Sequence, residues 1–209
     1  MHLAGARGVI CSGSGLGNEA TFVRADKWVP HWKDISIETA EKELLFRYLR
    51  AFGPATISDF AWWTGMRISD AKEIWSRAEA DIAQVDVEGW KASVVQSDLP
   101  ELEKAEVKQP VVRLLPYFDS FLLGHKEKQH LVEARNSKSV YRPQGWVAPV
   151  LLVNGHAQGV WSHTRTKKNL EVRVSPFSKV SSLVSSRLRE EATSLGQFLG
   201  SPNVDTKIT

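Results

Sequence analysis

The sequence predicts an α+β protein in which a small helical unit with a β-hairpin precedes a β-rich domain closed by a helix. Apolar residues keep helical spacing as far as Ile82 and then alternate with polar ones. Beyond Pro110, short apolar runs separated by turn dipeptides predict a small, barrel-like sheet. With 209 residues, 42% of them hydrophobic, the chain is long enough for two or three small packed domains.

Residues 36–97 are predicted to begin with two helices. Gly53-Pro54 ends the first helix, because proline forces the preceding residue out of helical geometry. Thr56 and Asp59 have the spacing of a reciprocal cap, which predicts that the second helix starts there. Gly65 supplies the turn that ends it.

A third helix and a hairpin complete this unit. Ser69 is expected to cap the third helix. From Ile82 to Val95 the period is two, with a turn at Glu88-Gly89. The order helix, helix, turn, helix and hairpin is that of a winged helix-turn-helix.

Residues 1–35 are expected to form a hairpin and a linker, the remnant of a preceding winged helix. Val9–Ser12 and Ala20–Val23 read as its two strands. The Gly-rich turn between them lacks the strand–loop–helix context of a dinucleotide-binding loop, so no cofactor is expected. A hairpin needs a surface to pack on, which predicts that a second copy of the chain or a separate protein covers it.

The second half is expected to comprise a linker at 98–110, a β-rich domain at 111–200 and a flexible tail at 201–209. The predicted strands include Phe118–Leu123, Val150–Val153 before the turn Asn154-Gly155, and the alternating Leu170–Val174. A closing helix runs through Val180 to Leu199 and stops at Gly200.

The charge distribution favours a negatively charged partner. Up to Pro110 the chain has 13 Lys or Arg and 17 Asp or Glu, whereas from Val111 onward it has 14 and 7. Double-stranded DNA is the predicted partner. No apolar run approaches the ~18 residues that span a bilayer, so no membrane contact is expected. The single Cys11 excludes an internal disulfide and a Cys-rich zinc site, and predicts a reducing, cytoplasmic location.

The strongest predicted DNA contact is a basic hairpin tip around residues 163–168. The third helix is a weaker one, because its outward charges cancel, whereas helices that read bases carry few acids. The predicted DNA-binding residues are Arg67, Lys72, Arg77, Lys126, Lys128, Arg142, His163, Arg165, Lys167 and Lys168.

Few residues suggest chemistry. The six histidines show no metal spacing, so no metal site is expected, and no nucleophile motif is present. Asp119 is enclosed by apolar and aromatic residues in the sequence, so it must be paired or hydrogen-bonded. We expect an arginine partner for it, and the alternative is that it positions a group at the DNA face.

Three ordered blocks carry a family resemblance. Gly53-Pro54-Ala55-Thr56 with Asp59–Gly65, Leu114–Asp119 with Leu122-Leu123-Gly124, and Pro149–Gly155 with Gly159-Val160-Trp161 resemble the AlkZ/YcaQ-like winged-helix DNA glycosylases. The resemblance implies tandem winged helices and a β-rich part that grip DNA while alkylated or crosslinked bases are removed. It also implies a catalytic Gln-x-Gln or Gln-x-Asp pair in a unit ahead of the first hairpin.

Gln84-Val85-Asp86 spells that pattern on a predicted wing strand, outside its structural context. We therefore predict a DNA-binding protein of glycosylase origin that is not catalytic alone. One alternative is an active base-excision enzyme that uses Gln84 and Asp86, or Asp119. Another is a winged-helix regulator whose partner is a protein.

Overall fold

The computed structural model describes residues 2–17, 19–31 and 34–209, and its internal contacts divide the chain into Met1–Glu41 and Lys42–Thr209. The first unit contains four short elements: α1 (His2–Ala6), β1 (Ile10–Ser12), β2 (Phe22–Arg24) and α2 (Ala25–Trp28). Strands β1 and β2 pair antiparallel, which confirms the first predicted hairpin. Large apolar side chains of this unit are exposed, among them Leu3, Phe22 and Trp28. A partner that covers them stays a prediction.

The second unit begins with a winged helix, as predicted. Its elements are α3 (Ile37–Phe52), α4 (Ile57–Thr64), α5 (Ile68–Arg77), β3 (Ile82–Val87) and β4 (Trp90–Val95). Thr56 and Asp59 form the predicted reciprocal cap of α4, and Gly65 ends that helix with φ +73°. Residue Ala55 adds a bridge to Ser93 of β4, which ties the wing to the start of α4.

An aromatic core holds these helices together. Tyr48 and Phe60 are fully buried, with ring centroids 5.3 Å apart, and Trp75 lies 6.3 Å from Phe60. These side chains come from α3, α4 and α5, so each helix contributes its apolar face. The predicted cap at Ser69 is wrong: α5 starts at Ile68, with Arg67 in the cap position, two residues earlier than predicted, and the Ser69 hydroxyl donates to Asp70 instead.

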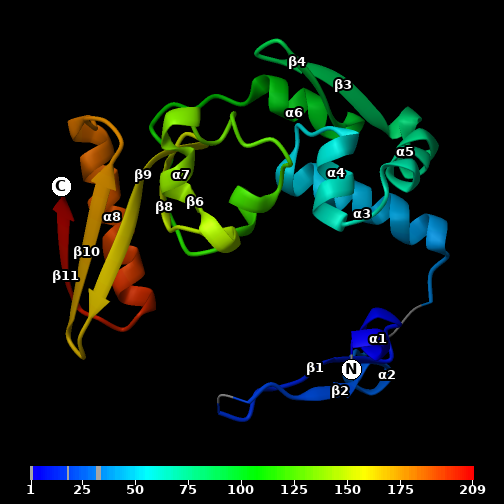
Figure 1. The fold of residues 1–209 in the computed structure, drawn as a ribbon, viewed down its shortest axis with the longest axis horizontal. Coiled ribbons are helices and arrows are strands. Elements are labelled where there is room, and N and C mark those ends of the chain that lie inside the picture. The colour runs from blue at the N-terminus through cyan, green and yellow to red at the C-terminus, as the bar shows by residue number, and fades with distance from the viewer. Residues whose placement is uncertain (1, 18, 32–33) are drawn as a thin grey trace. The chain divides into compact units, whose positions relative to one another are not determined.

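The β-rich part is a curled five-stranded sheet, a half-barrel. Its strand order is β11-β10-β9-β8-β5, antiparallel except for the parallel pair β10 and β11. The strands are β5 (Val112–Leu115), β8 (Val150–Val153), β9 (His156–Arg165), β10 (Asn169–Pro176) and β11 (Asn203–Ile208). Helix α8 (Ser182–Phe198) lies beside β9, β10 and β11, as Figure 1 shows.

The two faces of this sheet have different cores. The residues Leu170, Val172 and Val174 of β10 alternate and face a core, as predicted, and the structure shows that α8 supplies the other side of that core. On β8, Leu151 joins that core while its neighbour Val150 packs against Leu122 and Val140 of the preceding segment. That segment also carries α7 (Ser137–Val140) and a small hairpin of β6 (Tyr141–Arg142) and β7 (Trp146–Val147).

Three expectations for this half need correction. Phe118–Leu123 is not a strand, because Asp119 caps a 3₁₀ helix at Ser120–Leu123. The 201–209 tail is not flexible: β11 pairs with β10 from Asn203 to Ile208, and Val204 and Ile208 pack on the α8 core. The predicted 98–110 linker contains a helix, α6 (Leu99–Lys104).

Candidate nucleic-acid interface

The β9–β10 hairpin presents the predicted cationic tip. Arg165 ends β9, and Thr166 to Asn169 form the turn, held by the Thr166 amide donating to the Asn169 carbonyl at 2.8 Å. The Asn203 amide donates to the Lys168 carbonyl at 3.2 Å, so the start of β11 braces the turn. His163 lies on the same strand, its ring centroid 5.7 Å from that of Trp161. All these basic side chains are exposed.

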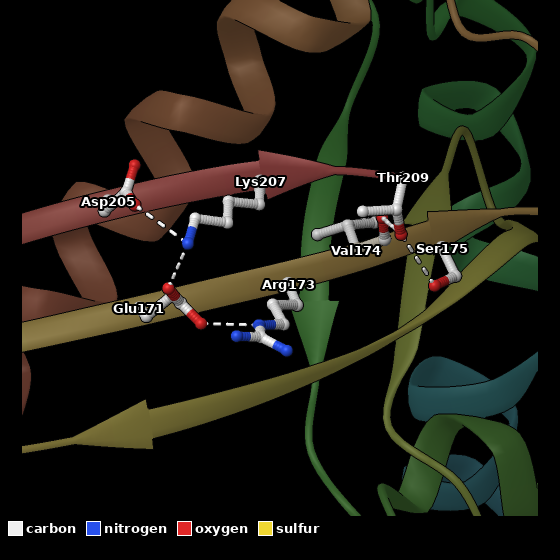
Figure 2. A network of polar contacts seen from close by, with 7 residues as sticks. All are labelled: Glu171, Arg173, Val174, Ser175, Asp205, Lys207 and Thr209. Atoms are coloured by element: carbon white, nitrogen blue, oxygen red, sulfur yellow. Dashed lines mark hydrogen bonds and ion pairs between the residues drawn. The ribbon is translucent and has the colours of Figure 1, made fainter.

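Farther along the same sheet the cations are neutralised. Figure 2 shows Glu171 between Lys207 and Arg173, with an oxygen 2.5 Å from a nitrogen of each. The side chains of Arg165, Lys167 and Lys168, by contrast, have no ion pair among the residues that the structure describes. Positive charge at the tip is therefore free for an outside anion.

The cations of α5 are less free. Arg67 pairs with Asp70 at 3.0 Å, and Arg77 pairs with Glu73 at 2.8 Å. Lys72 alone of the three has no ion pair within the described residues. It lines a groove with Trp75 and Gln84. In Figure 1, α5 and the β9–β10 hairpin lie at opposite ends of the second unit, so the structure does not bring these two predicted sets together.

Lys126 and Lys128 lie on a segment, residues 124–130, that docks on the winged helix. Lys126 keeps an exposed side chain. The Lys128 ammonium lies 4.1 Å from the centre of the Trp62 ring and donates to the His125 carbonyl. Burial lowers the pKa of Lys128 to about 8, and the charges of Asp59 and Glu127 only partly offset this. Lys128 is thus engaged inside the protein, and its assignment as a DNA contact stays a prediction.

Sequence analysis did not reveal that the Asp59 carboxylate holds residues 124–130 in place. Asp59 is 4% exposed. One of its carboxylate oxygens accepts from the amide and hydroxyl of Thr56 at 2.9 and 2.6 Å, while the other accepts from the Lys126 amide at 2.9 Å. The cap spacing revealed the first partner, but nothing local could reveal a partner 67 residues away.

Histidines line the same junction. His125 is buried, with Nε2 3.3 Å from the Pro54 carbonyl, and its ring centroid lies 4.4 Å from that of His130. Burial, together with the charge of the neighbouring His125, lowers the pKa of His130 to about 4. Beside these rings is a cavity of about 460 Å³, lined by Asp59, Trp90 and Lys126 among others.

Two of the three catalytic candidates, Asp86 and Asp119, make structural hydrogen bonds. Gln84 and Asp86 are both exposed on β3, and Asp86 accepts from the Gly89 amide at 2.9 Å, which stabilises the wing turn. Asp119 accepts from the Phe121 amide at 2.9 Å. Its expected arginine partner is absent from the ion pairs of the described residues, because a backbone N–H fills that role.

Arg142, the remaining predicted contact, is exposed on β6, and its Nε donates weakly to the Ser139 carbonyl at 3.4 Å. Within the described residues no three His, Cys, Asp or Glu side chains gather as a metal site would need. Nor does any helix there have the length and apolar character for crossing a bilayer.

The fold and surface together define a class: an α+β protein in which a winged helix is joined to a half-barrel with a free cationic hairpin. The chain belongs to the AlkZ-like DNA glycosylase family, whose model matches residues 1–198. This confirms the resemblance seen in the sequence.

Two comparisons show how much of a relative is covered. The interstrand DNA cross-link repair glycosylase of Streptomyces sahachiroi is 32% identical over 208 residues, which is 97% of this chain and 55% of that protein. The solved structure of the DNA glycosylase AlkZ from Streptomyces sahachiroi superposes with a TM-score of 0.83 at 28% identity, again over 97% of this chain and 55% of that one. The chain thus spans about half the length of the relatives it matches.

Proposed function

We propose that this chain binds duplex DNA in base-excision repair and does not by itself carry the group that activates water. The observation that carries the proposal is the set of cations on the β9–β10 hairpin that have no ion pair with any residue described by the structure. Lys and Arg that neutralise phosphates release counterions, which gives sequence-independent affinity. A two-stranded ribbon of this kind also has the width to enter a groove.

The structural roles of Asp86 and Asp119 support the second half of the proposal. A pair that positions water must have free oxygen or amide groups facing the sugar. Asp86 and Asp119 are each used to hold a turn or a helix start. The name of the Streptomyces sahachiroi relative makes crosslinked or otherwise modified duplex DNA the substrate to test.

The binding half is tested by fluorescence anisotropy on a short duplex over a salt series. Removing the three cations in Arg165→Ala/Lys167→Ala/Lys168→Ala should reduce the slope of log K against log salt by about 2–3, since each phosphate contact contributes about 0.9. The matched control is Arg173→Ala/Lys207→Ala, which removes cations already engaged by Glu171 and should change the slope little. Equal slopes for both variants would contradict the proposal.

The catalytic half is tested by release of an alkylated base from duplex DNA by the chain alone. The expected result is no release above the rate of the DNA without protein. Release that is lost in Gln84→Ala, Asp86→Asn or Asp119→Asn would instead establish the alternative, an active glycosylase in its own right. Binding without any salt dependence would favour a protein-interaction module.

A further inference from the structure

Three large aromatic rings gather on the surface of the second unit, away from the hairpin tip in sequence. Tyr117, Phe118 and Trp146 are 51%, 43% and 46% exposed. The Trp146 ring makes edge contacts with both others, at 5.3 Å to Tyr117 and 4.9 Å to Phe118. We call these three rings the aromatic platform.

The backbone beneath the platform is held in an unusual conformation. Phe118 has φ +56°, a left-handed conformation that bulky residues rarely adopt. The Phe118 amide donates to the Val147 carbonyl of β7 at 3.4 Å, which ties this turn to the small hairpin. Gln144, in the loop of that hairpin, also has a positive φ, +63°. Strain of this kind persists where the surroundings enforce it, and it is enriched at functional sites.

Charge around the platform indicates what it binds. Arg142 is the direct cross-strand partner of Trp146, so the two side chains lie on one face of the β6–β7 hairpin. The adjoining Asp119 carboxylate accepts from the Phe121 amide, so part of its hydrogen-bonding capacity is satisfied internally. Flat exposed rings next to a guanidinium suit a ligand that combines a π-face with a phosphate.

We propose that the aromatic platform stacks on a nucleobase that has left the DNA helix, while Arg142 contacts a neighbouring phosphate. This rests on the proposed function and adds to it a preference for DNA with an unpaired base. Any base has a π-face, so the preference would be for helix distortion rather than for sequence. An unpaired or damaged base also requires the least energy to extrude.

The experiment compares two duplexes that differ only in one extra, unpaired 2-aminopurine. The wild-type chain should bind the bulged duplex more tightly and quench 2-aminopurine fluorescence, since stacking quenches that base. Trp146→Ala should weaken binding to the bulged duplex about 10-fold, within the range for loss of one stacked base, and change binding to the paired duplex less than about 2-fold. Trp146→Phe, which keeps a ring, should retain most of both signals.

Two further variants serve as controls. Phe198→Ala removes a ring that is 86% exposed on α8, and the affinity for both duplexes should be unchanged. Tyr117→Ala should reproduce part of the Trp146→Ala loss, and circular dichroism checks that each variant is folded.

Several outcomes would overturn the stacking proposal. One is equal affinity of the wild-type chain for the two duplexes, without quenching of 2-aminopurine. The proposed function would still stand in that case if Arg165→Ala/Lys167→Ala/Lys168→Ala lowered the salt slope. Unchanged DNA binding in Trp146→Ala, together with loss of self-association in sedimentation, would show that the platform is a contact between copies. Absence of binding to either duplex would remove both proposals.

Discussion

Removing the Asp59 carboxylate should loosen the junction between the winged helix and residues 124–130. Asp59→Ala removes the Asp59 half of the reciprocal cap of α4, which accepts from the Thr56 amide and hydroxyl, and leaves the Lys126 amide without its acceptor. Loss of a cap costs about 1 kcal/mol. A buried donor left unsatisfied costs about 1–3 kcal/mol more. The expected loss of unfolding free energy is therefore about 2–4 kcal/mol, or roughly 5–15 °C in Tm for a domain of this size.

The assay is thermal and urea unfolding followed by helix circular dichroism, with Ser181→Ala as the matched control. Ser181 caps α8 by accepting from the Val184 amide at 3.2 Å. Within the described residues its side chain holds no second segment, so its loss should cost about 1 kcal/mol. Hydrogen exchange at the Lys126 amide should increase in Asp59→Ala and not in Ser181→Ala. Equal destabilisation by the two variants, with Lys126 still protected, would refute a junction role for Asp59.

Asp59 should also make the free energy of unfolding depend on pH in the acid range. Burial alone would raise the pKa of Asp59, but hydrogen bonds from the Thr56 side chain, the Thr56 amide and the Lys126 amide outweigh it and hold the pKa below its usual 3.8. A carboxyl group with a depressed folded pKa stabilises the fold above its unfolded pKa, and this contribution is lost as the pH falls through the folded value. Asp59→Asn should lack that component, which urea midpoints between pH 5 and about 2 would reveal.

Two further predictions concern neighbouring residues. Gly124→Ala should destabilise the protein by about 1–3 kcal/mol in urea unfolding, because its new Cβ would lie 2.3 Å from the Phe52 ring. The control is Gly5→Ala in α1, which has nothing within 4 Å of the new Cβ and should not destabilise the protein. Lys128 titrates near 8 when folded and near 10.5 when unfolded, so the unfolded chain binds more protons between these values and stability should rise with pH there. Lys128→Met should flatten that rise in urea midpoints measured from pH 7 to 10.5, and an unchanged profile would contradict the assigned burial.

Short-range patterns in the sequence determined most of the helices, strands and turns. The cap spacing of Thr56 and Asp59, the turn at Glu88-Gly89 and the alternation of Leu170–Val174 each involve residues a few positions apart. Such patterns act through hydrogen bonds and faces within one element, so they can be recognised before any partner is known. The family likeness in three ordered blocks was visible for the same reason, and it is confirmed.

Only the tertiary structure decided which charged groups remain free and which segments meet. Lys128 and Arg165 are both basic residues in the sequence. In the structure Lys128 rests on the Trp62 ring inside a junction, whereas Arg165 is exposed at the end of β9. The second partner of Asp59 and the pairing of β11 with β10 both join residues more than 30 positions apart. Contacts of that range depend on which buried surfaces fit together, and local propensity carries no information about that fit.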